Sequence, residues 1–330
     1  MPFTPHGSNI LVTGGTGTFG KAFIRHALEH LDPERLVVFS RDELKQHEMR
    51  TSGFDDPRLR YFIGDVRDET RLRRAMSGVD VVVHAAALKQ VPACEYNPFE
   101  AIMTNVMGAR NVVEASIDAG VKRVIALSTD KAVAPVNLYG ATKLCSEKLF
   151  TQSNAYASGT ETVFANVRYG NVLGSRGSVI PLFKKQRETG VVTVTHPEMT
   201  RFWLRVEQGV DLVVKAMEMT RGGEIFVPKI PSMRIVDLAH TIAPDCNIEF
   251  IGVRPGEKLH ETMISADESR QTLELDDLFI VEPEGATWHR GASPLGRRVA
   301  EGFTYVSDTN DQWITGDQLR VLAGEPARAA

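Results

Sequence analysis

The chain has 330 residues, and 42% of them are hydrophobic, which is enough to bury one large core or two modest ones. An intrinsically disordered protein and a small disulfide-held scaffold are therefore excluded. Basic and acidic residues number 38 and 42, a formal net charge of -4 with no basic block, so nucleic acid and anionic membranes are not expected partners. A small molecule is the favoured partner.

Cysteine spacing and hydropathy indicate the compartment. Cys94, Cys145 and Cys246 form no C-x-x-C pair, so we expect reduced thiols, no disulfide and no metal site. Apolar stretches such as 79–88 are much shorter than the roughly 20 residues that span a bilayer, and the glycine-rich turn at Gly14 leaves no room for a signal peptide before it. We predict a cytoplasmic protein without a membrane segment.

Strand-like and helix-like segments alternate along the first half of the chain. Short apolar, β-branched runs predict buried strands at 10–12, 36–39, 61–63, 79–83, 124–127 and 163–167. Apolar residues at helical spacing predict helices over 21–31, 69–76, 100–119 and 139–156. This order predicts an α/β fold, with a Rossmann-like, doubly wound parallel sheet over residues 1–172. Beyond it the pattern loosens, and we expect a smaller mixed region over 173–330, parts of which pack back onto the sheet.

A glycine-rich turn follows the first predicted strand directly. Glycines let the backbone turn tightly and approach a pyrophosphate, and the helix N-terminus that comes next offers free N–H donors. Gly14, Gly17 and Gly20 are spaced G-x-x-G-x-x-G, which resembles the short-chain dehydrogenase/reductase variant of the dinucleotide fingerprint. An ordinary βα turn is the alternative interpretation.

The residues after the next two strands bear on cofactor choice. A site for NAD would place an acid at the end of the second strand, but here Ser40, Arg41 and Asp42 follow it, with Lys45 one turn later. Arg41 and Lys45 suit a 2′-phosphate, which predicts NADP. Alternatively, Ser40 or Asp42 caps the next helix while the two cations face water. Asp65, after the third strand, is either an adenine contact or a turn-forming aspartate.

The fifth predicted strand ends in Ser128-Thr129-Asp130-Lys131, at the sheet edge where open α/β sheets carry catalytic groups. Tyr139 and Lys143 follow at the start of a helix, four residues apart and hence on one face. The ammonium would lower the pKa of the phenol and hold the nicotinamide ribose, so Tyr139 is the predicted base for a sugar hydroxyl. Two packing residues are the alternative.

An acid beside an amine suggests a second proton-transfer step. The Asp130 carboxyl could protonate a departing hydroxyl, and the Lys131 amine could remove a proton next to a carbonyl. Together they predict the elimination of water from a ketosugar. A surface ion pair or a helix cap is the alternative.

These segments together resemble an extended short-chain dehydrogenase/reductase, and within that group the inverting UDP-N-acetylglucosamine 4,6-dehydratases of pseudaminic acid synthesis. Further segments that carry the resemblance are 40–45, 64–68, 84–89, 137–143, 168–171, 199–203 and 254–258. Related retaining enzymes have Asp-Glu where this chain has Asp130-Lys131, so Lys131 points to inversion at C5. Tyr139 favours the pseudaminic branch over relatives in capsule synthesis that lack the tyrosine.

The resemblance implies a complete reaction. Tyr139, assisted by Lys143, removes the C4 hydroxyl proton while NADP+ takes the C4 hydride, and Thr129 binds the C4 oxygen. Lys131 removes the C5 proton and Asp130 protonates the departing C6 hydroxyl. The hydride then returns to C6, and a proton is delivered to the opposite face of C5. The product is UDP-2-acetamido-2,6-dideoxy-β-L-arabino-hex-4-ulose, and a tightly bound NADP is recycled in each turnover.

The resemblance also implies the binding residues. The cofactor would contact Gly14, Thr16, Gly17, Thr18, Phe19, Gly20, Ser40, Arg41, Asp42, Glu43, Lys45, Asp65, Val66, Ala86, Asn105, Tyr139, Lys143 and Val172. UDP-N-acetylglucosamine would contact the C-terminal region and Lys89, Asn171, Arg176, Arg201 and Arg254. Solvated surface charges are the alternative for the cations, and helix bending or packing is the alternative for Asn105.

Other functions on the same fold remain open: a retaining nucleotide-sugar dehydratase, a UDP-sugar 4-epimerase or reductase, and an NADP-binding redox sensor. The pair Asp130 and Lys131 favours a dehydratase, because an epimerase or reductase has no elimination to perform. His84 reads as a buried structural histidine, and no metal is predicted. The resemblance further implies a homo-oligomer.

Overall fold

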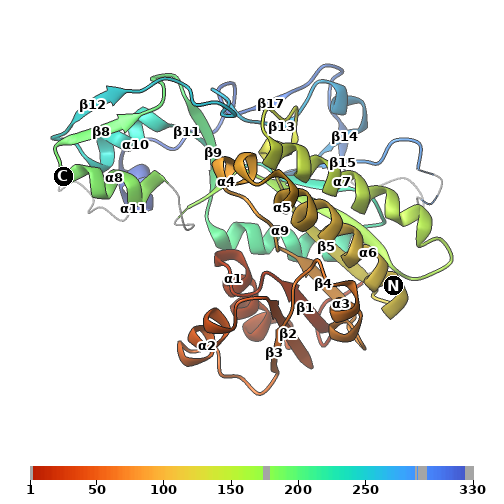
Figure 1. Cartoon of the computed structure of the whole chain (residues 1–330). Helices are drawn as coiled ribbons and strands as arrows, with labels where there is room; N and C mark the ends of the chain where they lie inside the picture. The colour runs from red at the N-terminus through yellow and green to blue at the C-terminus, as the bar shows by residue number, and fades with distance from the viewer. Residues whose placement is uncertain (1–2, 174–178, 287, 289–295, 324–330) are drawn as a thin grey trace.

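The computed structural model describes residues 3–173, 179–286, 288 and 296–323, and within them a ten-stranded sheet forms the centre of the molecule (Figure 1). The strand order is β16-β14-β15-β10-β6-β5-β4-β1-β2-β3. Its parallel strands are β1 (Asn9–Thr13), β2 (Arg35–Ser40), β3 (Leu59–Ile63), β4 (Val81–His84), β5 (Arg123–Thr129), β6 (Val163–Tyr169) and β10 (Ile225–Pro228). The antiparallel edge consists of β15 (Leu278–Val281), β14 (Thr272–Glu274) and β16 (Arg297–Arg298). The predicted α/β fold is confirmed.

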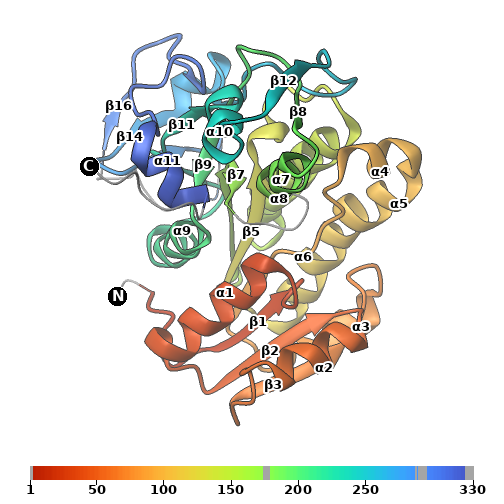
Figure 2. The same cartoon turned by 90° about the vertical axis from the view of Figure 1, so that its left-hand side faces the viewer.

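Helices cover both faces of the sheet (Figure 2). One face carries α1 (Thr18–His26), α2 (Glu43–Thr51) and α9 (Val206–Met219), and the other carries α3 (Glu69–Ala75), α6 (Gly108–Ala119) and α7 (Leu138–Tyr156). Strands of a parallel sheet covered in this way are buried on both faces and mostly apolar, as in β6, where every residue is buried. The apolar runs therefore predicted the strands well.

The helices differ more from the prediction. Residues 98–119 form α5 (Pro98–Ile102), the π-helical turn η2 (Met103–Met107) and α6, where one helix over 100–119 was expected. A second π-turn, η1 (Ala27–Leu31), ends the helix predicted over 21–31. The short helix α4 (Val91–Tyr96) was not predicted, and α2 was anticipated only as the helix that Ser40 or Asp42 would cap. Helix α2 buries only Gln46 and Met49, too few residues for a periodic apolar signal.

The chain from residue 171 onward contributes to two parts of the fold, the central sheet and a smaller unit. Strands β10, β14, β15 and β16 extend the central sheet, whereas a smaller unit stands beside it in Figure 1. That unit contains β7 (Asn171–Val172), β8 (Val191–Val194), β9 (Thr200–Leu204), β11 (Ser232–Arg234), β12 (Asn247–Phe250), α8 (Val179–Arg187), α10 (Ile235–Ile242) and α11 (Gly316–Ala323). Phe183, Trp203 and Leu238 belong to its core. The division at residue 172 into cofactor and substrate regions stays a prediction.

A buried arginine joins the two halves of the chain. Arg168, near the end of β6, is 1% exposed, and its Nη2 donates to Glu147 of α7 at 2.8 Å and to Glu268 of η4 (Asp267–Gln271) at 2.9 Å. Its Nη1 donates to the carbonyl of Met263 at 2.8 Å. Charge-assisted bonds of this kind are strong, and leaving one partner buried alone is costly.

Substituting Arg168→Met should therefore destabilise the protein by about 3–5 kcal/mol, because Glu147 stays buried without its cation. The free energy of unfolding in urea checks this. The matched control is Lys215→Met, which breaks the more exposed pair with Asp277 (2.6 Å) and should cost less than about 1 kcal/mol. Equal losses in the two variants would contradict the argument.

Candidate active site

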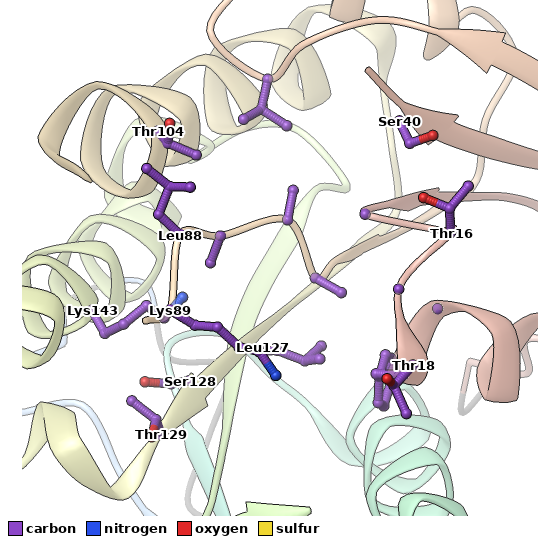
Figure 3. Close-up of a pocket in the computed structure, with 18 of the residues that line it drawn as sticks. Thr16, Thr18, Ser40, Leu88, Lys89, Thr104, Leu127, Ser128, Thr129 and Lys143 are labelled. Carbon is purple, nitrogen blue, oxygen red and sulfur yellow. The ribbon is translucent and has the colours of Figure 1, made fainter. Parts of the chain in front are cut away.

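A cavity of about 600 Å³ opens at the carboxyl edge of the sheet, where β1 and β4 are neighbours and the strand order reverses. Open α/β sheets bind ligands at this switch point. The lining residues come from the glycine turn, the ends of β2 to β6 and the start of α7 (Figure 3). All predicted cofactor residues line the cavity except Glu43 and Asn105.

The glycine turn packs too closely for side chains. Gly14 has φ +67°, and a Cβ there would lie 2.9 Å from the backbone nitrogen of Ala86. A Cβ on Gly20 would lie 2.6 Å from the Cα of Gly15. The turn therefore presents backbone to the cavity, together with the side chains of Thr16 and Thr18 (Figure 3). This arrangement suits a phosphate.

The polar segment at the end of β2 supplies both a helix cap and cavity-lining side chains. Asp42 caps α2, because its Oδ1 accepts the backbone N–H of Lys45 at 3.0 Å, and its Oδ2 lies 2.7 Å from Lys45 Nζ. Ser40, Arg41 and Lys45 nevertheless line the cavity. Arg41 Nη1 lies 3.6 Å from Asp65 Oδ2, so the ends of β2 and β3 are linked across the cavity wall.

Asp65 forms a turn and also lines the cavity. Its Oδ1 accepts the backbone N–H of Arg67 at 3.0 Å, which makes it a turn-forming aspartate. Its Oδ2 accepts from the Arg67 guanidinium at 2.8 Å, and the residue also lines the cavity.

The loop after β4 is fixed by two buried polar side chains. Thr13 Oγ1 accepts the N–H groups of Ala85 and Ala86, at 3.1 and 3.2 Å, so its own proton is directed to His84 Nδ1 at 2.9 Å. Asn105 Oδ1 accepts from Leu88 N–H at 2.8 Å. This loop forms the floor of the cavity.

Asn105 acts beneath the cavity rather than in its lining. Its Nδ2 donates to the Leu88 carbonyl at 2.8 Å and to Thr142 Oγ1 of α7 at 3.0 Å. The side chain thus ties the η2 turn to the loop and to the helix that carries Tyr139. The packing alternative describes it better than a direct cofactor contact.

The acid and the amine of the fifth strand are in contact. Asp130 is completely buried, and its Oδ1 accepts from Thr129 Oγ1 at 2.9 Å and from Lys131 Nζ at 3.1 Å. Burial raises the pKa of Asp130, and Lys131 opposes this rise only in part. For Lys131, burial lowers the pKa, but Asp130 and Glu261 together raise it above its usual range. Burial thus shifts Asp130 toward its acid form, while the neighbouring carboxyl groups stabilise the ammonium form of Lys131.

Tyr139 and Lys143 lie beside this pair. Burial raises the pKa of Tyr139 to about 12, while Lys131 and a hydrogen bond with Thr129 lower it. Burial lowers the pKa of Lys143 to about 8. Gly140 permits the close approach, because a Cβ there would overlap the carbonyl oxygen of Lys131. Since both side chains line the cavity, they are not merely packing residues.

The predicted substrate-binding residues differ in their position relative to the cavity. Lys89 and Asn171 line the cavity; burial lowers the pKa of Lys89, and Asn171 Oδ1 is buried with no hydrogen-bond partner among the described residues. Arg254 is exposed, 3.9 Å from a carboxylate oxygen of Glu257. Arg176 lies outside the described residues.

Arg201 is buried outside the cavity lining, contrary to the expectation that it faces substrate. Its Nη1 donates to the carbonyls of Thr200 and Leu259 at 2.7 and 3.1 Å, and its Nη2 donates to that of Lys258 at 3.0 Å. Its Nε lies 3.7 Å from Glu261 Oε1. With these donors satisfied by the protein, Arg201 is a structural cation in this arrangement.

Glu261 was missed by the sequence reasoning. It is 1% exposed and lies 3.0 Å from Lys131 Nζ, yet it is 130 residues away in the sequence. In the sequence, its role is indicated only by its position three residues after the segment 254–258, which carries the family resemblance. Ser128 and Tyr169, which line the cavity, were also missed as site residues.

The described residues show neither a cluster of metal-ligating side chains nor a membrane-spanning helix. They contain no group of three or more His, Cys, Asp or Glu side chains that could hold a metal ion. They also contain no helix with the length and apolar character needed to cross a membrane.

The family described as polysaccharide biosynthesis protein matches residues 10–283. The chain belongs to this family. It is 51% identical over 323 residues, 95% of its length and 96% of the relative's, to the UDP-N-acetylglucosamine 4,6-dehydratase (inverting) of Campylobacter jejuni. It is also 46% identical to a UDP-glucose 4-epimerase of Rickettsia conorii, over 84% of this chain and 83% of the relative.

Solved structures confirm the fold. Pen from Bacillus thuringiensis superposes with a TM-score of 0.85 at 40% identity, covering 94% of this chain and 96% of that protein. DesIV, a dTDP-glucose 4,6-dehydratase of Streptomyces venezuelae solved with NAD bound, gives 0.68 at 24% identity over 76% and 86%. The latter similarity shows the fold alone.

The environment of His84 generates a prediction. Burial, with a smaller effect of the Lys143 charge, lowers the pKa of His84 to about 3. The ring should therefore stay neutral and keep accepting the Thr13 proton, so its NMR chemical shifts should not titrate between about pH 5 and 9. The variant His84→Gln, which lacks only that signal, assigns it. A titration midpoint within that range would contradict the prediction.

Proposed function

We propose that the chain is an NADP-dependent, inverting UDP-N-acetylglucosamine 4,6-dehydratase, a carbon-oxygen lyase that acts at the first step of pseudaminic acid synthesis. The contact between Asp130 and Lys131 at 3.1 Å, beside Tyr139 in one cavity, carries the proposal. The relative that is 51% identical and bears this name supports it. The product is UDP-2-acetamido-2,6-dideoxy-β-L-arabino-hex-4-ulose.

The residues present fit a nicotinamide dinucleotide. The Gly14 turn, which a Cβ would fill, suits the pyrophosphate, and Arg41 with Lys45 suits a 2′-phosphate. When bound, the dinucleotide accepts the hydride from C4 and returns it to C6. Lys143, with its buried amine, would hold the ribose beside Tyr139.

Tyr139 takes the proton from the C4 hydroxyl in the first stage. Its pKa of about 12 has to fall for this role. Lys131 already lowers it, and the Lys143 ammonium, one turn away on the same helix, would add to this effect. Thr129, which already bonds to Tyr139, hydrogen-bonds the C4 oxygen.

Asp130 and Lys131 perform the elimination. The acid form that burial favours gives Asp130 a proton for the departing C6 hydroxyl. Lys131 takes the C5 proton, on the face that leads to inversion. Its ammonium form has to lose a proton first, which requires an acceptor inside the protein.

The substrate and setting complete the proposal. Lys89 and Asn171, which line the cavity, would contact UDP-N-acetylglucosamine, and the region 173–330 would hold the uridine diphosphate. Arg254 and Arg176 remain candidates for the diphosphate. A cytoplasmic homo-oligomer belongs to the same proposal.

A UDP-sugar 4-epimerase is the second candidate, because the Rickettsia relative at 46% identity bears that name. An epimerase would use Tyr139 and the dinucleotide but would have no elimination for the buried acid and amine to perform.

Incubation of the purified protein with UDP-N-acetylglucosamine in D2O, without added cofactor, tests the proposal. Proton NMR and mass spectrometry should show loss of one water, one deuterium at C5 and an L-arabino coupling pattern, because C5 takes a solvent proton on the face opposite to the one that lost its proton. A product that keeps its C5 configuration would indicate a retaining dehydratase. A 4-epimer without water loss would indicate the epimerase.

Cofactor preference gives a separate prediction. Arg41→Ala should weaken NADP binding about tenfold or more and leave NAD binding nearly unchanged, because a charge-assisted bond to the 2′-phosphate is worth about 1.5–3 kcal/mol. Calorimetry on the cofactor-stripped protein measures both constants. Arg50→Ala, on α2 but paired with Asp55 away from the cavity, is the matched control. Equal weakening of both dinucleotides would count against NADP.

A further inference from the structure

Lys131 touches a second carboxylate, outside the cavity. Glu261 directly precedes β13 (Thr262–Ile264), and its Oε1 lies 3.0 Å from Lys131 Nζ, which is also 3.1 Å from Asp130 Oδ1. Asp130 lines the cavity and Glu261 does not. The amine is therefore held between one carboxyl group that can meet a ligand and one that cannot.

The position of Glu261 is fixed by the C-terminal part of the chain. Its backbone N–H donates to Ser307 Oγ at 2.9 Å, and its carbonyl accepts the Ser307 N–H at 2.9 Å. Ser307 Oγ contacts Thr200 Oγ1 at 2.7 Å. Because the side chain is also buried, the carboxylate cannot turn toward water instead of Lys131.

The charges around the cluster distinguish its two carboxyl groups. Besides Lys131, the cations that face Glu261 are Arg201 and Lys258, and Tyr139 faces Lys131 from α7. Burial would raise the pKa of Glu261, but Lys131 and Arg201 bring it below its usual value, whereas the pKa of Asp130 is raised. Neighbouring carboxyl groups driven apart in this way divide into an acid and a base.

A lysine removes a proton from carbon only as the neutral amine, whereas Lys131 rests as the ammonium. Asp130 is reserved as the acid for the C6 oxygen. Glu261 is the remaining carboxylate within reach. Its Oε2 is buried and has no hydrogen-bond partner among the described residues, and its Oε1 already contacts the amine.

We propose that Glu261 is a positioning residue for the dehydration proposed above, holding Lys131 toward the sugar and accepting a proton from Nζ as Nζ takes the C5 proton. The electrons of the C5–H bond form the C4–C5 enolate. The enolate then expels the C6 oxygen, which leaves as water with the Asp130 proton. Glu261 has gained one proton and Asp130 has lost one, and transfer back through Lys131 restores the cluster. The new C5 proton comes from solvent.

Comparison of Glu261→Gln with the wild type, both with their bound cofactor, tests this role. With UDP-N-acetylglucosamine, Glu261→Gln should still show the near-ultraviolet absorbance of reduced nicotinamide, because Tyr139 is intact. Water loss, followed by mass spectrometry, should fall by about a hundredfold or more. Glu249→Gln, an exposed carboxylate on β12, is the matched control and should behave as the wild type.

The possible results distinguish a failure of the proposed dehydratase function from a failure of the proposed role of Glu261. Wild-type protein that loses no water would overturn the dehydratase function itself. Wild-type activity together with normal water loss in Glu261→Gln would overturn the role of Glu261 alone. Should that variant not fold, Glu261→Asp keeps a carboxylate one methylene shorter and should slow elimination more than C4 oxidation. Equal slowing of both steps in Glu261→Asp would indicate a structural role and overturn the proposal.

Discussion

Removal of ionisable groups from water at one edge of the sheet governs the chemistry of this protein. Asp130 and Glu261 are buried within reach of a single amine, and they could not both be ionised there without cations. Lys131 and Arg201 stabilise the charge on Glu261, and Asp130 holds its proton more firmly as a result. Burial and the nearby cations thus shift the pKa values of two similar carboxyl groups in opposite directions.

Much of this arrangement was predictable from the sequence because its signals are local. A sheet covered on both faces requires continuous apolar strands, and the six predicted runs all became strands of the sheet. The ends of those strands placed Ser40, Asp65 and Asp130 around one cavity, as the topology requires. The turn at Gly14 was equally predictable, because the close approach of the backbone there requires glycine.

The rest depended on contacts between distant segments. Glu261 lies in no segment with helical or strand periodicity. The pairing of β13 with β17 (Tyr305–Val306) holds it next to Lys131. Arg201 looked like a ligand for a diphosphate because its sequence says nothing of the backbone carbonyls that surround it. Helix α2 was indicated only by its Asp42 cap, because it buries no more than Gln46 and Met49.

Neighbouring strands of the central sheet are separated by a long stretch of sequence, and this has a consequence for synthesis on the ribosome. Strand β6 ends at Tyr169, but its second neighbour, β10, begins only at Ile225. While the intervening residues are being made, the nascent sheet presents an open, apolar edge of the kind that invites pairing with other chains. The same interval leaves Lys131 without Glu261. The contact between Lys131 and Glu261, and the pairing of β10 with β6, can thus form only late in synthesis.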